Sequence, residues 1–239
     1  MEFLGFKTVD KKPALYHPGM DLVVISDIHL GLEGSMTSKG SYVPQFQLED
    51  IIEELEEVKK ETGAERILVN GDLKNQFSTS YTEKKEIEQF LESLKENFEE
   101  IILIKGNHDT ILENTAEKKG LNLRESFSEE GYLFVHGHKE VEEDFEVLVI
   151  GHEHPALALT DEVGITEKID CFLYGEIEDG KIVVMPSYSK ISNGSEINRM
   201  PRKKLLSPVL QKNGVKRLKA IGISREAGIL EFPEVSKIK

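Results

Sequence analysis

The chain has 239 residues, of which 38% are hydrophobic and 31% are charged, and it carries a formal net charge of −14. This composition is ordinary for a soluble globular protein with a charged surface, and no run approaches the 18 apolar residues that a membrane-spanning helix needs. The single cysteine, Cys171, excludes an internal disulfide, and the N-terminus has no apolar run typical of a signal peptide, so we expect a cytoplasmic protein with no membrane partner.

The first half of the sequence alternates strands and helices. Residues 22–25, 66–70 and 101–105 are apolar runs that predict three buried strands. The helix after the first strand ends at Gly63, a typical C-cap residue, and its predicted apolar face consists of Leu48, Ile51, Ile52, Leu55 and Val58. Thr82 is the predicted N-cap of the next helix, whose apolar face consists of Ile87, Phe90, Leu91, Leu94 and Phe98. This order predicts parallel strands joined by right-handed crossovers.

The second half is richer in strand patterns. Residues 121–138 and 219–232 each resemble a hairpin, and residues 168–186 form a clearer one with "EDGK" as its turn. Residues 145–154 contain another buried strand. We therefore predict an α/β first half and a mainly β second half, in a single domain spanning residues 1–239.

Polar residues follow five of these apolar runs. They are Asp27 and His29; Asp72; Asn107, His108 and Asp109; His136 and His138; and His152 and His154. Six of the seven histidines belong to these clusters, and only His17 does not. Because ligands bind outside the carboxyl ends of strands in α/β sheets, we expect the clusters to converge.

The residue types indicate a metal site. Aspartate, histidine and asparagine suit borderline or hard divalent ions such as Mn, Fe, Zn, Co or Ni, and the absence of cysteine excludes a thiolate-rich structural zinc site. Taken singly, each cluster has a simpler interpretation, since an aspartate after a strand is usually a turn former or helix cap. Four glycines, each beside a proposed ligand, let the backbone approach an ion closely: Gly71, Gly106, Gly137 and Gly151.

The ordered motifs "DIH", "GD", "GNHD", "HGH" and "GHEH" between residues 27 and 154 resemble the signature blocks of the calcineurin-like metallophosphoesterases. The blocks "GDLKNQF" and "GHEHPALAL" are most similar to the archaeal SbcD-related branch. The resemblance implies a four-layer α-β-β-α sandwich of two mixed sheets flanked by helices. It also implies two divalent ions, manganese first among the candidates (Fe, Zn, Ni, Co and Mg being the others). One ion would be held by Asp27, His29 and His154, the other by Asn107, His136 and His152, and both would be bridged by Asp72.

The resemblance further implies hydrolysis of a phosphoester by a metal-activated hydroxide. His108 would face the substrate phosphate, with Asp109 orienting its ring, and His138 has no assigned role. If the chain stays extended after residue 25, Asp27 and His29 point the same way, while Ile28 turns toward the core.

The substrate is left open by the sequence. A phosphodiesterase or nuclease acting on DNA or RNA, a small-molecule phosphomonoesterase and a non-catalytic scaffold all fit this fold, with residues 32–46 and 73–82 as the candidate rim. Residues 199–219 contain eight basic and no acidic residues. This basic C-terminal segment could contact a phosphate backbone, although a solvated tail or a loop pairing with the acidic surface is the simpler interpretation.

Overall fold

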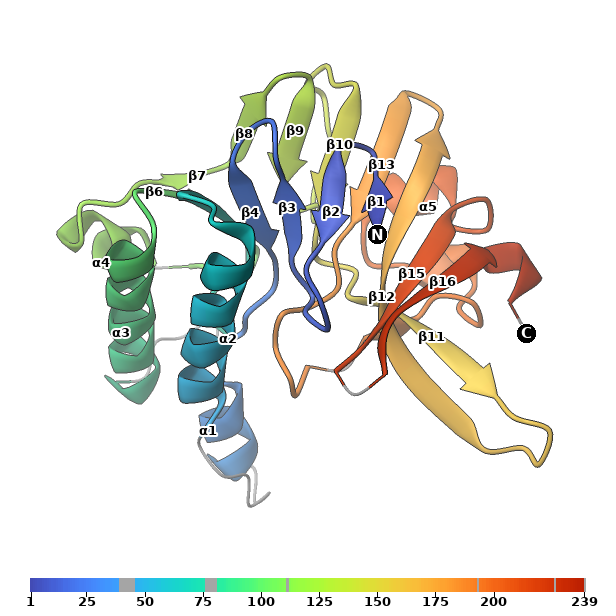
Figure 1. The fold of residues 1–239 in the computed structure, drawn as a ribbon, viewed down its shortest axis with the longest axis horizontal. Coiled ribbons are helices and arrows are strands. Elements are labelled where there is room, and N and C mark those ends of the chain that lie inside the picture. The colour runs from blue at the N-terminus through green and yellow to red at the C-terminus, as the bar shows by residue number, and fades with distance from the viewer. Residues whose placement is uncertain (39–45, 76–80, 111, 193, 226, 239) are drawn as a thin grey trace.

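Two β-sheets pack against each other at the centre of the fold, and helices lie on their outer sides (Figure 1). This computed structural model describes residues 1–239 except 39–45, 76–80, 111, 193, 226 and 239. The arrangement confirms the four-layer α/β sandwich expected from the sequence. Within the described residues, no helix is both long and apolar enough to cross a membrane.

The first sheet has seven strands in chain order. They are β1 (Glu2–Phe3), β2 (Phe6–Thr8), β3 (Leu15–His17), β4 (Leu22–Ile25), β5 (Arg66–Asn70), β6 (Glu100–Ile104) and β7 (Leu123–Arg124). Strands β4 to β7 are parallel, which confirms the parallel arrangement of the three predicted strands. Strands β1 to β3 were not predicted, because two or three residues are too few to show a strand periodicity.

Helices α2 (Gln47–Thr62) and α3 (Tyr81–Asn97) connect these parallel strands. Gly63 ends α2 in the left-handed conformation (φ 69°), and its N–H donates to the carbonyl of Lys59, as expected for a C-cap glycine. The N-cap prediction for Thr82 was wrong, because α3 already begins at Tyr81 and Thr82 lies inside its first turn. Two shorter helices, α1 (Leu32–Ser38) and α4 (Glu113–Lys118), lie in the same half of the chain.

The second sheet contains the predicted hairpins. Its strand order is β14 (Ser195–Glu196), β11 (Pro155–Thr160), β12 (Thr166–Ile177), β13 (Gly180–Val184), β10 (Val147–Ile150), β9 (Tyr132–Val135) and β8 (Ser126–Glu129). The final hairpin, β15 (Lys219–Ser224) and β16 (Gly228–Glu234), joins it through β12. Strand β11 was not predicted; it pairs with the first half of β12, while the second half pairs with β13.

Three apolar layers hold the sandwich together. Strand β4 illustrates the period of two, since Val23 packs toward the helices whereas Val24 packs between the two sheets. The third layer lies on the far side of the second sheet, beneath α5 (Pro208–Asn213) and the short 3-10 helices η1 (Arg202–Lys204) and η2 (Val235–Lys237).

The basic segment 199–219 is part of the folded core, so its interpretation as a solvated tail was wrong. Its apolar residues are buried in the third layer: Leu205, Val209, Leu210, Val215 and Leu218. Its charged side chains stay exposed. Hydrophobic burial therefore fixes the segment in place and leaves its cations on the surface.

Candidate metal centre

The carboxyl ends of β4 and β10 bring the first group of potential ligands together. This group consists of Asp27, His29 and His154, whose ligand atoms all lie within 4.8 Å of one another. Asp27 Oδ1 lies 3.0 Å from His154 Nε2, and the Nε2 atoms of His29 and His154 are 3.3 Å apart. The three residues assigned to one ion from the sequence therefore lie in one cluster.

A second group lies beside the first. Asp72, His136 and His152 also place their ligand atoms within 4.8 Å of one another. Asn107 joins them, because its Oδ1 lies 3.1 Å from His136 Nε2. Asp72 Oδ2 lies 3.3 Å from His136 Nε2 and 4.0 Å from His29 Nε2, so this carboxylate faces both groups. All seven predicted ligands thus converge at one edge of the two sheets.

The backbone of this site is strained. Five of the predicted ligands have positive φ angles between 45° and 64°, namely Asp27, His29, Asp72, His152 and His154. The left-handed conformation costs a non-glycine residue about 1–2 kcal/mol, and such strain concentrates at functional sites. The chain therefore does not stay extended at residues 27–29, so the condition for the predicted orientation of Asp27 and His29 is not met. Two left-handed residues flank Ile28, which is buried in the core as expected.

The charges of the site favour a bound cation. Burial would raise the pKa of Asp27, but His154 and His136 hold it well below its usual range. Burial would lower the pKa of His136, but its hydrogen bond with Asp72 and the charge of Asp27 raise it to about 9. Burial lowers the pKa of His29 and of His152 to about 4. The site thus combines ionised carboxylates with the neutral imidazoles of His29 and His152, while the same carboxylates hold on His136 a proton that a bound cation would replace. This set of oxygen and nitrogen donors fits divalent transition-metal ions.

Gly106 makes room for Asp72. A Cβ atom on Gly106 would lie 2.1 Å from Asp72 Oδ1 and 2.2 Å from its backbone nitrogen. We expect Gly106→Ala to displace Asp72, to reduce bound metal and to lower the melting temperature by several degrees, because overpacking costs about 1–3 kcal/mol and each kcal/mol corresponds to about 2–4 °C. Metal analysis and thermal unfolding measure both effects. Gly34→Ala in α1 is the control, because its Cβ would meet nothing within 4 Å; equal results for the two variants would contradict the argument.

His108 borders the first ligand group. Its ring centroid lies 5.4 Å from that of His29, nearly perpendicular to it. Its Nδ1 lies 2.5 Å from the carbonyl oxygen of Asn75, so Nδ1 carries the proton of this hydrogen bond and Nε2 is the ring nitrogen that could exchange a proton with a substrate.

Asp109 does not orient this ring as expected. Its carboxylate accepts hydrogen bonds from the backbone N–H groups of Lys74 and Gly106, so it holds together the two loops that carry Asp72 and His108. Burial raises its pKa to about 6, with the charge of Asp72 as the second cause. In the turn of the "GNHD" motif, Asp109 is buried and points inward. The carbonyl of Asn75 contacts the ring of His108 instead.

The remaining histidines have different surroundings. His138 lies beside the second group, its ring 5.2 Å from His136 and 6.0 Å from His152. His17 lies in the N-terminal sheet and packs against the rings of Phe6 and Tyr132. Sequence position alone therefore separated His17 correctly from the six clustered histidines.

Residues after β13 also support the first ligand group, and the sequence analysis missed them. Ser187 Oγ donates to the carbonyl of Asp27, and Ser192 Oγ lies 3.1 Å from His154 Nδ1. Ser189 donates to the side chain of Gln47, whose amide lies within hydrogen-bonding distance of the carbonyls of Ile28 and His29. The available signal was the serine-rich stretch "PSYSK" directly after a buried strand, which follows the same strand-end rule as the ligands.

Glu153, between His152 and His154, was also missed. It is fully buried, and its Oε2 accepts hydrogen bonds from the backbone N–H groups of Leu206 and Ser207 at 2.7 and 3.1 Å. Ser207 Oγ in turn donates to the carbonyl of Gly137, next to His136. The carboxylate of Glu153 and the hydroxyl of Ser207 thus connect the basic segment to the turns that contain His152 and His136.

We expect Glu153→Ala to lower the melting temperature by at least about 4 °C, because each buried N–H group left without an acceptor costs about 1–3 kcal/mol. Glu153→Gln, which keeps one acceptor oxygen, should lose less. Thermal unfolding of the metal-free protein is the measurement, with Glu178→Ala, at an exposed turn, as the control. An unchanged melting temperature in Glu153→Ala would show that these hydrogen bonds do not hold the turns.

Comparisons with known proteins agree with this geometry. Residues 20–217 match the family model described as calcineurin-like phosphoesterase. The crystal structure of the nuclease MPE from Pseudomonas putida is similar, with a TM-score of 0.61 and 15% sequence identity over 90% of each chain. Yfce, a phosphoesterase from E. coli, matches with a TM-score of 0.39 and 19% identity over 72% of this chain and 83% of the other. No curated protein matches the sequence. The extent of the family match shows that this chain belongs to the calcineurin-like phosphoesterase family.

Proposed function

We propose that the protein is a metal-dependent phosphodiesterase that uses two divalent ions and acts on nucleic acid. The observation that carries this proposal is the pair of adjacent ligand groups, both faced by the carboxylate of Asp72. Asp27, His29 and His154 would hold one ion, and Asn107, His136 and His152 the other. Two such ions, when bound, supply Lewis-acid activation of the phosphoryl group and of the attacking water.

The other roles belong to the side chains around the ligands. His108 is placed to hold a proton at Nε2 and to donate it to the phosphate or the leaving oxygen, since its Nδ1 is engaged by Asn75. Asp109 keeps the loops of Asp72 and His108 in register through two backbone hydrogen bonds. Ser187, Ser189 and Gln47 hold the strained turn that contains Asp27 and His29. Ser192 contacts the ring of His154.

The candidate rim of the site favours nucleic acid over a small phosphomonoester. The exposed fractions of Phe46 and Tyr81 are 59% and 86%. Phe46 precedes Gln47, which contacts the His29 carbonyl, and Tyr81 lies two residues before Glu83, which packs against Gly31. Exposed aromatic rings on segments that border a phosphate site suit base stacking. Within the candidate rim, residues 39–45 and 76–80 lie outside the described part of the chain.

Two resemblances support the same choice. The P. putida protein of similar fold is a nuclease, and the blocks "GDLKNQF" and "GHEHPALAL" are similar to the SbcD-related branch. We propose manganese as the first ion to test, because the oxygen and nitrogen donors fit it without a thiolate.

Hydrolysis of bis-p-nitrophenyl phosphate and of p-nitrophenyl phosphate, each with added manganese, tests the proposal. We expect a clear preference for the diester and loss of activity after chelation, restored by manganese. A preference for the monoester would instead indicate a phosphatase, and no turnover of either substrate with any divalent ion would indicate a non-catalytic scaffold.

A further inference from the structure

A surface hollow of about 760 Å³ lies between the start and the end of the basic segment. Four cationic side chains line it: Arg199, Arg202, Lys216 and Arg217. Polar side chains of Asn198, Asn213 and Ser236 also line it, and none of its described lining residues is acidic. We call this hollow, with its four cations, the basic groove.

The basic groove stands out against the charge of the whole protein, which is −14. Among the described residues, none of the four cations forms an ion pair with a carboxylate. Arg199 donates to the hydroxyl of Thr160, and Arg202 donates to the carbonyl of Gln211, so both guanidinium groups are held by neutral partners. Positioned cations without neutralising carboxylates create a local positive potential that attracts an anionic ligand.

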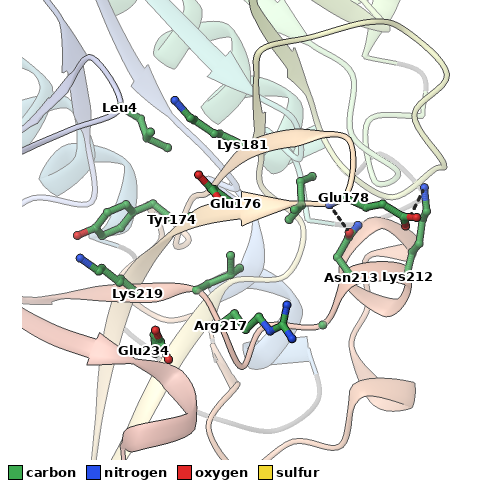
Figure 2. A pocket seen from close by; sticks show the side chains of 14 residues that line it. Leu4, Tyr174, Glu176, Glu178, Lys181, Lys212, Asn213, Arg217, Lys219 and Glu234 are labelled. Carbon is green, nitrogen blue, oxygen red and sulfur yellow. Dashed lines mark hydrogen bonds and ion pairs between the residues drawn. The ribbon is translucent and has the colours of Figure 1, made fainter.

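The neighbouring hollow, of about 840 Å³, differs in its charges (Figure 2). It shares Asn213, Gly214 and Arg217 with the basic groove. However, its lining also includes the carboxylates of Glu176, Glu178 and Glu234 (Figure 2), and its Lys212 pairs with Asp179 and Glu178. The larger hollow is therefore close to neutral. Of the two hollows, only the basic groove has a clear excess of positive charge.

The chain connects the basic groove to the candidate metal centre over a short distance. Ser195 N–H donates to the carbonyl of His154 at 2.7 Å. Arg199 follows Ser195 by four residues, so the Cα atoms of Ser195 and Arg199 are at most about 14 Å apart. At the other side of η1, the backbone N–H groups of Leu206 and Ser207 bind Glu153. A strand bound at the metal centre could therefore place further phosphates in the groove.

We propose that the basic groove binds the phosphate backbone of the nucleic acid substrate, away from the phosphate that is cleaved. This inference rests on the proposed function, since it names a second contact surface for the same substrate. The guanidinium groups of Arg199, Arg202 and Arg217 provide planar donors that match phosphate oxygens, and Lys216 adds a point charge. Such contacts are independent of base sequence and release counterions.

Binding of a fluorescein-labelled single-stranded oligonucleotide to the metal-free full-length protein, measured by anisotropy over a series of salt concentrations, tests the groove. The double variant Lys216→Ala, Arg217→Ala removes two exposed cations. We expect its affinity at about 0.1 M salt to fall at least about tenfold, and the slope of log Kd against log salt to decrease by about 1.4, because each lost phosphate contact contributes about 0.7 for a single strand.

The control is the double variant Lys60→Ala, Lys118→Ala, which removes two exposed lysines from α2 and α4, on the opposite side of the molecule from the basic groove (Figure 1). It should keep the wild-type slope. Three results would each overturn the proposed role of the groove: equal binding by wild type and the groove variant, an equal loss in both double variants, or no binding by wild type at low salt. The diester assay on wild type tests the proposed function separately, so either proposal can fail while the other stands.

Discussion

Replacing His108 by alanine is expected to lower the turnover of bis-p-nitrophenyl phosphate by at least about 100-fold, the size of a general acid–base contribution, while both metal ions stay bound. The reason is its position: the ring lies beside His29, outside both ligand groups, and Asn75 fixes its Nδ1. The loss should appear in kcat more than in KM, because proton donation acts on the transition state. Steady-state kinetics and metal analysis of the same preparation provide the two measurements.

His17→Ala is the matched control for His108→Ala. It removes an imidazole that packs against Phe6 and Tyr132 in the N-terminal sheet, so a change in stability is expected but the turnover of the folded enzyme should be retained. Near-normal turnover in His108→Ala would remove His108 from the chemistry. Loss of an ion from that variant would instead make it a ligand.

Most of the candidate site could be predicted from the sequence because its residues follow strands. Parallel strands bring their carboxyl ends to one edge, so Asp27, Asp72 and His152 meet although 125 residues separate the first from the last. The same rule does not predict in which direction a side chain points once the strand has ended. Five ligands adopt left-handed backbone angles, and such angles depend on the packing around them, which a local residue pattern does not contain.

The missed residues have a common property: each acts through a contact that is distant in sequence. Glu153 binds the N–H of Ser207, 54 residues away, and Ser187 binds the carbonyl of Asp27, 160 residues away. Buried polar groups must find partners, but the partner of a lone glutamate or serine is set by tertiary packing. In the fold, long apolar runs predicted the central strands and helices well, whereas the short strands β1 to β3 carried too little pattern.

The carboxylate of Asp72 faces both ligand groups. Burial would raise its pKa, but the hydrogen bond with His136 outweighs this effect and keeps the pKa below its ordinary value, so the residue is ionised at neutral pH. Its Oδ1 accepts a hydrogen bond from the backbone N–H of His108 at 2.9 Å. Its Oδ2 is the atom that lies near both His136 and His29.

Asp72→Asn is therefore expected to lose metal at both positions, from about two ions per chain to well below one, since in the proposed function this one carboxylate would serve both ions. Asparagine keeps the shape, tolerates the left-handed backbone (φ 46°) and can still accept the hydrogen bond from His108. What it removes is the negative charge that the two proposed ions would share, so activity should fall by more than the 10- to 100-fold that changes in outer contacts of a metal site cost. Metal analysis after dialysis is the decisive measurement.

Asp21→Asn is the matched control for this change. Asp21 also has a left-handed backbone (φ 48°), and its carboxylate accepts hydrogen bonds from Tyr16 and from the backbone N–H of Glu65, but it lies outside both ligand groups. The same loss of charge there should leave metal content and turnover unchanged. If Asp72→Asn still bound two ions per chain, the bridging role would be wrong. The first group would then hold its ion through Asp27 and its histidines, and the second through Asn107 and its histidines.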